Sequence, residues 1–273
     1  MPQTIQLSPL PALAGRSQVK CGTCALNRLC LPMGLDEAGV ARLDKIVKRR
    51  RVDRDENLFR MDEPFKSMYA IRFGHFKTFR INPSGEQHVV GFPMAGDVLG
   101  MDAIGSQRHH SAAVALEDSE VCEIPFSSFE KLTAELPGLQ RHFYRVMGHE
   151  ISREQSAMLL LGGMRAEQKF AVFLLNLSAR YAARGYSPLR FQLRMSREEI
   201  GNYLGLTIES ISRLLLRFKQ KGLVRIDKRE VEITDRVSMD ALASGHTLAE
   251  PIASRARAPR TIMFSQVHAQ AAA

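Results

Sequence analysis

The stretch RMSREEIGNYLGLTIESISRLLLRFKQKGLVRI restricts the folds open to this chain more than any other part of it. Ser196 followed by Glu199 is a capping-box pattern, which predicts a helix that begins at residues 196–197. That helix is expected to end at Gly205, after which Thr207 can cap a second helix. The second helix is predicted by apolar residues that recur at helical spacing, namely Ile208, Ile211, Leu214, Leu215 and Phe218.

Two short helices joined by a glycine-containing turn form a helix-turn-helix, whose second helix can enter the major groove of DNA. Gly222 predicts the end of this second helix. The following LVRIDKREVEIT predicts a hairpin wing with Lys228 and Arg229 at its tip. We therefore expect the C-terminal part of the chain to bind double-stranded DNA.

Three polar residues of the second helix share one face because they are spaced i, i+3 and i+4: Glu209, Ser212 and Arg213. Glutamate can accept from cytosine N4, arginine can donate to guanine O6 and N7, and serine can contact either kind of base edge. The alternative is a surface Glu–Arg pair worth about 0.2–0.5 kcal/mol. The place at the start of a recognition helix favours base contacts, and the predicted DNA-binding set also contains Thr207, Ser210, Lys228 and Arg229.

The centre of the chain has a different pattern. From Val52 to about Pro125, short apolar segments such as SMYAIRFGHFKTFRI alternate with turn residues, which predicts a small β-barrel or jelly roll. Before it, GLDEAGVARLDKIVKRRR predicts a short amphipathic helix with the basic run 48–51 at its solvent-exposed end. After it, PGLQRHFYRVMGHEISREQSAMLLLG predicts one long helix opened by Pro137 and closed at Gly162.

The long helix carries a row with the 4-3-4-3 spacing of a coiled-coil seam: Met147, Ile151, Glu154, Met158 and Leu161. Glu154 is the one charged residue in this row. In a parallel two-fold dimer it would face its own copy, so the two carboxylates would repel each other. The alternative is a small rotation of the helix that turns Glu154 to solvent beside Arg153.

The stretch KCGTCALNRLC contains Cys21, Cys24 and Cys30, and the fourth cysteine, Cys122, lies far downstream in SEVCEIP. Four cysteines in 273 residues are too few for a disulfide scaffold. No apolar run is long enough to cross a bilayer, and the first residues lack a signal-peptide pattern, so we expect a cytoplasmic protein without a membrane partner. Thiols stay reduced in the cytoplasm, which leaves metal binding or chance clustering.

Charge points to the same kind of partner as the helix-turn-helix. The formal net charge is +9, from 38 Lys and Arg against 29 Asp and Glu, which favours nucleic acid over a membrane surface. With 45% hydrophobic residues, the chain is long enough for a sizeable core and two domains. It lacks a Walker loop, a G-x-S-x-G elbow and an H-E-x-x-H helix, so we do not expect an enzyme.

GNYLGLTIESISRLL, FPMAGDVLG, VCEIP and the cysteine spacing together resemble the oxygen-responsive branch of the Crp/Fnr transcription regulators, from about Cys21 to His246. The resemblance implies an α+β fold with an N-terminal β-roll (a jelly-roll, cyclic-nucleotide-binding-like sensor domain), a long dimerisation helix and a C-terminal winged helix-turn-helix. The implied segments are a flexible tail (1–19), the cluster-binding loop and sensor domain (20–136), the dimerisation helix (137–163), the DNA-binding domain (164–246) and a disordered tail (247–273).

The same resemblance implies a function for the cysteines. In this family four cysteines with this spacing hold a [4Fe–4S] cluster, which stabilises a homodimer on palindromic promoter sites under anaerobic conditions until oxygen degrades it. Cys21, Cys24, Cys30 and Cys122 match that pattern. Four thiolates suit the irons of such a cluster, each of which takes one soft ligand. The alternatives are a zinc site, a thiol-redox site and buried cysteines without a ligand.

Two further expectations come from the resemblance. A cyclic-nucleotide regulator needs a Glu and an Arg in the segment after GDVLG, where this chain has Met101 and His110, so no cyclic nucleotide is expected. RNA polymerase is the expected second partner. The loop that contacts it in this family corresponds to INPSGEQ, which makes Ile81, Gly85 and Glu86 candidates, although a plain hairpin turn accounts for that stretch equally well.

Overall fold

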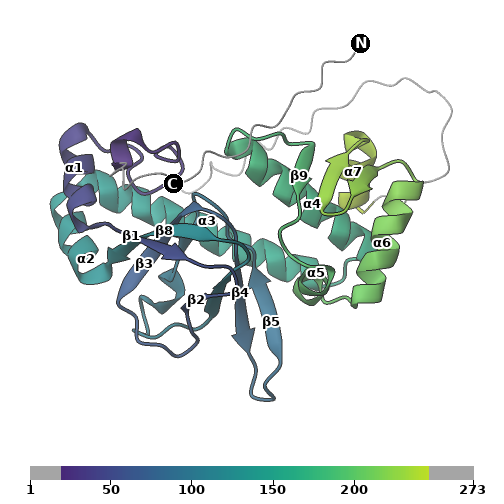
Figure 1. Cartoon of the computed structure of the whole chain (residues 1–273), viewed down its shortest axis with the longest axis horizontal. Coiled ribbons are helices and arrows are strands. Elements are labelled where there is room, and N and C mark those ends of the chain that lie inside the picture. Colours follow the sequence, from purple (N-terminus) through teal and green to yellow (C-terminus); the bar gives the residue numbers. More distant parts are fainter. Residues whose placement is uncertain (1–19, 246–273) are drawn as a thin grey trace, which may run out of the picture.

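The computed structural model describes residues 20–245, and of residues 159–161 only the backbone. The predicted tails (1–19 and 247–273) and His246 lie outside the described residues. Figure 1 shows a β-rich unit and a smaller, mostly helical unit, with the long helix α3 (Pro137–Leu161) between them. The α+β architecture predicted from the sequence is confirmed, and α3 begins at Pro137 and is followed by Gly162 as expected.

The N-terminal unit contains two four-stranded sheets whose strand pairs are all antiparallel, in the orders β1-β8-β3-β6 and β2-β7-β4-β5. One apolar core takes side chains from both sheets, among them Phe59, Ile71 and Phe76, each at most 2% exposed. The strands are β1 (Lys48–Val52), β2 (Asn57–Phe59), β3 (Ser67–Phe73), β4 (Phe76–Ile81), β5 (Gln87–Gly91), β6 (Val98–Leu99), β7 (Ala112–Ala115) and β8 (Ser119–Pro125).

The basic run Lys48 to Arg51 lies in strand β1, so its prediction as a helix end is wrong. Helix α1 (Glu37–Ile46) stops before it, after a start capped by Asp36, whose carboxylate accepts from the Gly39 N–H at 2.8 Å. Strand β1 pairs along its whole length with β8 and buries Val52 in the core. This long-range pairing determines the conformation, and a local helical pattern cannot reveal it.

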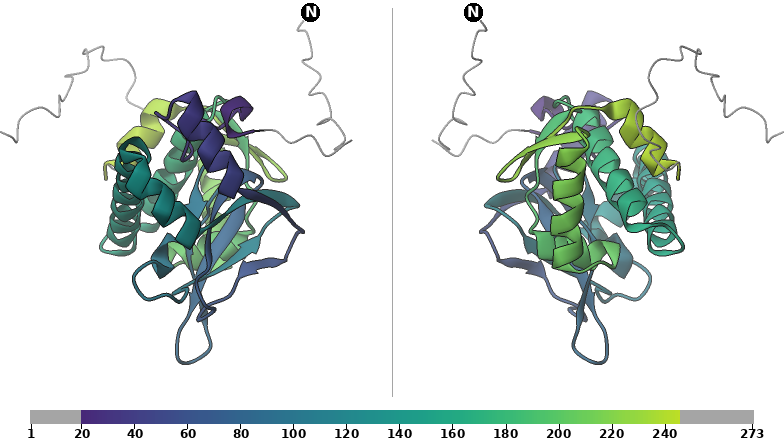
Figure 2. Two further views of the ribbon diagram at one scale, coloured as in Figure 1. Left: turned by 90° about the vertical axis from the view of Figure 1, so that its left-hand side faces the viewer. Right: turned by 90° about the vertical axis from the view of Figure 1, so that its right-hand side faces the viewer.

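A second core joins the cysteine loop, α1 and the β1-β8-β3-β6 sheet to α2 (Phe126–Glu135) and the first turns of α3. Its fully buried members include Leu31 and Leu43 at 1% exposure and Leu139 at 0%. The rings of Phe129 on α2 and Phe143 on α3 meet edge to face at 5.0 Å. Figure 2 shows α1 and α2 together at this end of the molecule. The sequence pattern did not predict helix α2 as a separate element.

The C-terminal unit has its own core, formed by α4 (Ala166–Ala183), the helix-turn-helix and a three-stranded sheet in the order β10-β11-β9. Phe92 and Met94 of the β-roll also belong to this core, so the two units share a packed boundary. The sequence predicted the hairpin but neither β9 nor α7. The remaining elements are α5 (Arg197–Leu204), α6 (Ile208–Gln220), β9 (Arg190–Gln192), β10 (Val224–Asp227), β11 (Glu230–Ile233), α7 (Arg236–Ala243) and the 3-10 turns η1 (Cys21–Thr23) and η2 (Met101–Ala103).

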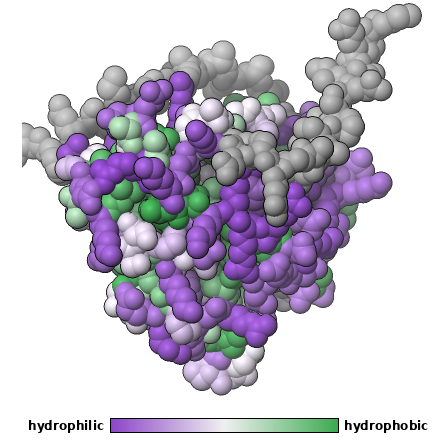
Figure 3. Space-filling view, turned by 60° about the vertical axis from the view of Figure 1, so that its left-hand side comes forward, coloured by the Kyte–Doolittle hydropathy of each residue, from purple (hydrophilic) through white to green (hydrophobic). Residues whose placement is uncertain are grey.

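The face drawn in Figure 3 is mostly hydrophilic, with apolar side chains reaching the surface between charged ones. Among the described side chains of helix α3, three large apolar ones are unusually exposed: Tyr144 (60%), Ile151 (53%) and Met158 (71%). None of the helices in residues 20–245 combines the length and apolar character needed to span a membrane.

Candidate metal centre and nucleic-acid interface

All four cysteines line one small pocket of the β-roll unit. Cys21, Cys24 and Cys30 come from the loop that precedes α1. Cys122 comes from the middle of β8, where it stands opposite Arg49 of β1 and Ala70 of β3. The fold therefore brings the distant cysteine to the three clustered ones, although their role as ligands stays a prediction.

Local hydrogen bonds hold the cysteine loop in place. The Cys24 N–H donates to the Cys21 carbonyl at 3.2 Å, and the Cys30 N–H donates to the Leu26 carbonyl at 3.0 Å. The Asp44 carboxylate on α1 accepts from the Cys21 N–H at 2.8 Å. Together with the buried Leu31, these contacts fix both ends of the loop beside β8.

The environment of Cys21, Cys30 and Cys122 opposes ionisation of their thiols. Burial raises the pKa of Cys30 to about 12, and burial is also the first cause of the raised pKa of Cys21 and Cys122. The Asp44 carboxylate raises the pKa of Cys21 further, and repulsion from the neighbouring thiolates adds to the raised pKa of Cys21, Cys30 and Cys122. A bound metal centre would reverse this balance, because coordination deprotonates a thiol.

The spacing of the thiols bears on the kind of centre they can hold. In the described part of the chain, no three Cys, His, Asp or Glu side chains converge closely enough to hold one metal ion. Around a single zinc ion the sulfur atoms would lie about 3.8 Å apart, given a Zn–S distance of about 2.3 Å. A [4Fe–4S] cluster takes one thiolate on each iron, so its four thiolates need not converge on one ion.

The helix-turn-helix forms through the local signals that predicted it. The Ser196–Glu199 capping box is present, Gly205 has a left-handed φ of 64°, and the Thr207 hydroxyl accepts from the Ser210 N–H at 3.2 Å. The helix forms where its apolar spacing predicted it. Of the apolar positions, Ile211, Leu214, Leu215 and Phe218 are at most 6% exposed, whereas Ile208 in the first turn is 45% exposed.

The predicted base-reading face of α6 is open to solvent. Glu209 and Arg213 are exposed, and Ser212 is half-buried with its hydroxyl 3.4 Å from an Arg197 guanidinium nitrogen. The pKa of Glu209 is lowered, because its carboxylate accepts hydrogen bonds from the backbone and from Thr207 and lies near the positive charge of Arg213. The helix thus presents an ionised carboxylate and a guanidinium on one surface, as contact with base edges requires.

Lys228 and Arg229 form the two-residue turn between β10 and β11, as predicted for a wing tip. Both side chains are exposed, and Lys228 has a positive φ of 52°. The Arg229 guanidinium donates to the Arg194 carbonyl at 3.2 Å, which ties the wing to the segment before α5. The wing and α6 belong to the same packed unit, since Leu214 of α6 and Val224 of β10 share its core.

The predicted seam on α3 is largely uncovered in the single chain. Ile151, Glu154 and Met158 are exposed, Met147 is half-buried against the second core, and the side chain of Leu161 lies outside the described residues. The predicted polymerase-contacting segment is the turn between β4 and β5. Ile81 ends β4, Gly85 has a φ of 86°, and the Glu86 N–H donates to the Asn82 side chain at 2.9 Å.

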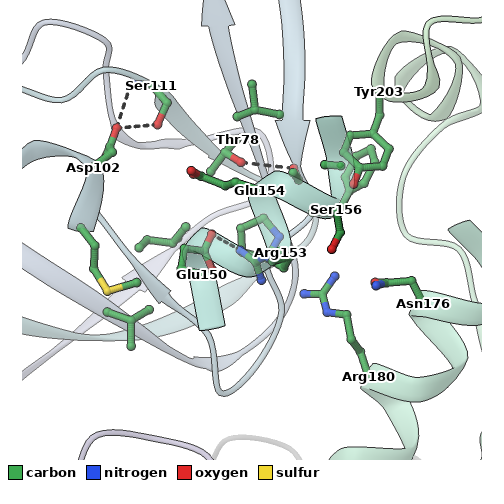
Figure 4. Close-up of a pocket in the computed structure, with 18 of the residues that line it drawn as sticks. Thr78, Asp102, Ser111, Glu150, Arg153, Glu154, Ser156, Asn176, Arg180 and Tyr203 are labelled. Carbon is green, nitrogen blue, oxygen red and sulfur yellow. Dashed lines mark hydrogen bonds and ion pairs between the residues drawn. The ribbon is translucent and has the colours of Figure 1, made fainter. Parts of the chain in front are cut away.

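In the segment after GDVLG, the Asp102 carboxylate accepts hydrogen bonds from the donors that could otherwise bind an anion. One of its carboxylate oxygens accepts from the His110 N–H (3.0 Å), the Ser111 N–H (3.0 Å) and the Ser111 hydroxyl (2.9 Å), and Figure 4 shows this pair on the pocket wall. His109 is only 2% exposed and stacks on Phe59 at 3.9 Å, so it is a packing histidine. The role of Asp102 was missed because a lone aspartate carries no distinctive sequence pattern.

Sequence reasoning also missed a buried ionic cluster between the two units. Asp97, just before β6, accepts from Arg180 of α4 (2.5 Å), from Arg184 at the C-terminal cap of α4 (2.7 Å) and from Arg153 of α3 (3.4 Å). Glu150 pairs with Arg153, and both line a cavity of about 140 Å3 bounded by the β-roll, α3, α4 and α5. Figure 4 shows Arg153, Arg180 and Tyr203 approaching this cavity from three different helices.

The architecture is that of a signal-controlled DNA-binding regulator: a nucleotide-binding-type β-roll followed by a long helix and a winged helix-turn-helix. Residues 49–135 match the cyclic nucleotide-binding domain, and residues 168–242 match the Crp-like helix-turn-helix domain. The chain belongs to the Crp/Fnr family of transcription regulators, and the resemblance seen in its sequence is confirmed. Neither matched domain is catalytic.

Relatives cover most of the chain. It is 48% identical over 216 residues to the transcriptional regulatory protein btr of Bordetella pertussis, and the matched region spans 79% of this chain and 89% of that protein. It is 42% identical over 235 residues to the fumarate and nitrate reduction regulatory protein of Escherichia coli K12, with 86% and 94% covered. The structure of FixK2 from Bradyrhizobium japonicum superposes with a TM-score of 0.67 at 28% identity, over 75% of this chain and 99% of that one.

Proposed function

We propose that this protein is an oxygen-responsive transcription regulator in which Cys21, Cys24, Cys30 and Cys122 hold a [4Fe–4S] cluster. The observation that carries the proposal is the meeting of these four thiols, from two distant segments, in one pocket of a Crp/Fnr-type β-roll. When bound, the cluster supplies iron–thiolate bonds that oxygen can break. Similarity to a fumarate and nitrate reduction regulatory protein supports the same reading.

The protein itself positions the thiolates and offsets their negative charge. Cys122 is held in a paired strand, while the other three sit on a loop held by hydrogen bonds to α1 and α3 and by the second core. Cysteinates on both segments therefore tie the loop to the sheet. Arg49 and Arg72 favour the thiolate form of Cys122, so they would offset negative charge at the centre. Loss of the tie would free the loop.

DNA binding would require a homodimer built on α3. The exposed Ile151 and Met158 give this helix an apolar face that a second copy can cover. Met147 and Leu161 are the other apolar members of the row predicted from the sequence. Two recognition helices about 34 Å apart would then read a palindromic site. In each half-site Glu209, Ser212 and Arg213 would contact bases, with Thr207, Ser210, Lys228 and Arg229 at the backbone or flanking positions.

The turn containing Ile81, Gly85 and Glu86 is the proposed contact for RNA polymerase. It lies in the hairpin that extends from the body of the β-roll in Figure 1, where a large partner can reach it. We expect the protein to act in the cytoplasm and without a cyclic nucleotide, since Asp102 already uses the donors around Ser111.

Anaerobic purification tests the proposal most directly. A brown protein that contains about four iron and four sulfide per chain and loses specific DNA binding in air is the expected result. A colourless protein that carries zinc would support the zinc alternative and refute the oxygen-sensing cluster, while leaving DNA binding intact. A colourless, metal-free protein whose DNA binding follows thiol oxidation would support the thiol-redox alternative.

Alanine variants of the recognition helix should separate base reading from backbone binding. Glu209→Ala and Arg213→Ala are each expected to cost about 1–3 kcal/mol at one base pair of each half-site. Lys228→Ala and Arg229→Ala should weaken binding to all sequences alike and reduce the salt slope by about 1 each. Titrations on specific and random duplexes at several salt concentrations measure both effects. Equal losses on the two duplexes for Arg213→Ala would contradict its base contact.

Glu154→Ala is expected to dimerise and bind DNA partly in air, without a cluster. Glu154 is exposed on α3, and Arg153 cannot readily offset its charge because it pairs with Asp97 and Glu150. Two such carboxylates facing each other in a partly desolvated seam repel by about 1–4 kcal/mol. Sedimentation of the aerobic variant measures the gain, with the exposed neighbour Gln155→Ala as control. A variant as monomeric as the wild type would show that this charge does not hold the chains apart.

A further inference from the structure

A buried histidine links the cysteine loop directly to the long helix. His142, in the second turn of α3, is only 5% exposed, and its Nε2 lies 3.1 Å from the carbonyl oxygen of Cys30. A carbonyl can only accept, so Nε2 must carry the proton and donate it. The hydrogen bond therefore runs from the dimerisation helix to the backbone of a proposed cluster ligand.

The surroundings make this contact a fixed one. Leu31, which follows Cys30, packs in the same core as Leu139 and Phe143, the neighbours of His142 on the inner face of α3. These three side chains are at most 7% exposed. Near the start of α3, Gly138 also lies close to the loop, since a Cβ there would stand 3.8 Å from the Gly34 carbonyl. The loop and the first turns of α3 thus form one packed assembly.

The opposite face of the same helix is the exposed one. Residues 142 and 151 are nine positions apart, which at about 100° per residue places them on opposite sides of α3. His142 faces the cysteine loop, whereas Ile151 is 53% exposed on the outer side. A contact that fixes the rotation of α3 on its inner side therefore also fixes how the outer face is presented to a partner helix.

We propose that His142 is a positioning residue that couples the cysteine loop to the dimerisation face of α3. The inference rests on the proposed function, because it concerns how the state of a loop held by four thiolates is transmitted to α3. While the loop is held, the Cys30 carbonyl accepts from His142 and α3 keeps one rotation. When the centre is lost, the loop is held by this hydrogen bond and the core alone and opens more often. Each opening leaves the buried N–H without its acceptor, which is unfavourable, and α3 can shift to recover one.

Two substitutions separate this coupling from simple packing. His142→Leu keeps the volume approximately and removes the donor, whereas His142→Gln keeps a donor that can reach the carbonyl. His149→Leu is the matched control, since His149 is exposed on the same helix. With clusters loaded anaerobically, all three variants should show the wild-type iron content. His142→Leu should dimerise about tenfold more weakly by sedimentation, and the other two should match the wild type.

A second measurement needs no cluster. In the metal-free protein, the alkylation rate of Cys30, followed by peptide mass spectrometry, should rise about tenfold in His142→Leu and stay near wild type in His142→Gln and His149→Leu. Wild-type protein that takes up no iron would refute the proposed function, and the alkylation rates would still decide whether His142 holds the loop. The coupling is overturned if loaded His142→Leu dimerises like the wild type, or if the glutamine variant behaves like the leucine variant.

Discussion

Cys122→Ala is expected to lose specific DNA binding under anaerobic conditions by more than about 100-fold while keeping its fold. The loss should exceed the 10–100-fold change that follows removal of an outer-shell partner of a metal, because a direct ligand is removed. Cys122 is the thiol on the strand side of the pocket, so its removal leaves the cysteine loop with no covalent tie to the β-roll through the metal centre. Iron content, visible absorbance and DNA titration without air measure the effect.

The same result is expected for Cys21→Ala, Cys24→Ala and Cys30→Ala, since three thiolates leave one iron of the cluster unprotected. Thr23→Ala is the matched control, because Thr23 lies in the same loop and is exposed. Circular dichroism of each variant checks that the β-roll remains folded. If one cysteine variant retains full absorbance and binding, that cysteine is not a ligand.

Features with local causes could be predicted from the sequence. The helix-turn-helix depends on a capping box, a left-handed glycine and a threonine cap, all within twelve residues of one another, and each is where the pattern placed it. The long helix likewise starts at Pro137 and stops before Gly162. Local signals failed where a distant strand decides the conformation, as in the run Lys48 to Arg51, whose pairing with β8 turns a predicted helix end into a strand.

The candidate site could be predicted only in part, for a related reason. The cysteine spacing identified the residues, but only the topology shows that Cys122 in β8 faces the loop that carries Cys30. His142 carries no recognisable pattern in the sequence, and the motif FPMAGDVLG contains Asp97 without revealing its ionic partners. Each acquires its importance from contacts with segments far away in the chain, at separations of 112 residues for His142 and Cys30 and 87 for Asp97 and Arg184. Such contacts are properties of the folded chain.

Asp97 occupies the place where a single substitution should most disturb the relation between the sensor and DNA-binding units. Its carboxylate is 16% exposed and accepts from three arginines on two helices and from the Met94 N–H at 2.9 Å. Burial alone would raise the pKa of Asp97, but Arg180, Arg153 and Arg184 together lower it below its ordinary value. Asp97→Ala would therefore leave Arg184, the most buried of these arginines, without its carboxylate partner.

We expect Asp97→Ala to lower the free energy of unfolding by about 3 kcal/mol, because removing one partner of a buried ion pair costs about 3–5 kcal/mol and Arg153 is partly exposed. A folded-state pKa below the unfolded one means that the stabilisation is present above about pH 4 and is lost as the pH falls through the folded-state pKa. The deficit of the variant should therefore shrink in acid. Urea titrations at pH 7 and below pH 4 measure both effects, with the exposed Asp240→Ala as a control that should change stability by less than about 1 kcal/mol. A pH-independent deficit, or one no larger than that of Asp240→Ala, would show that the arginine cluster does not join the two units through the charge of Asp97.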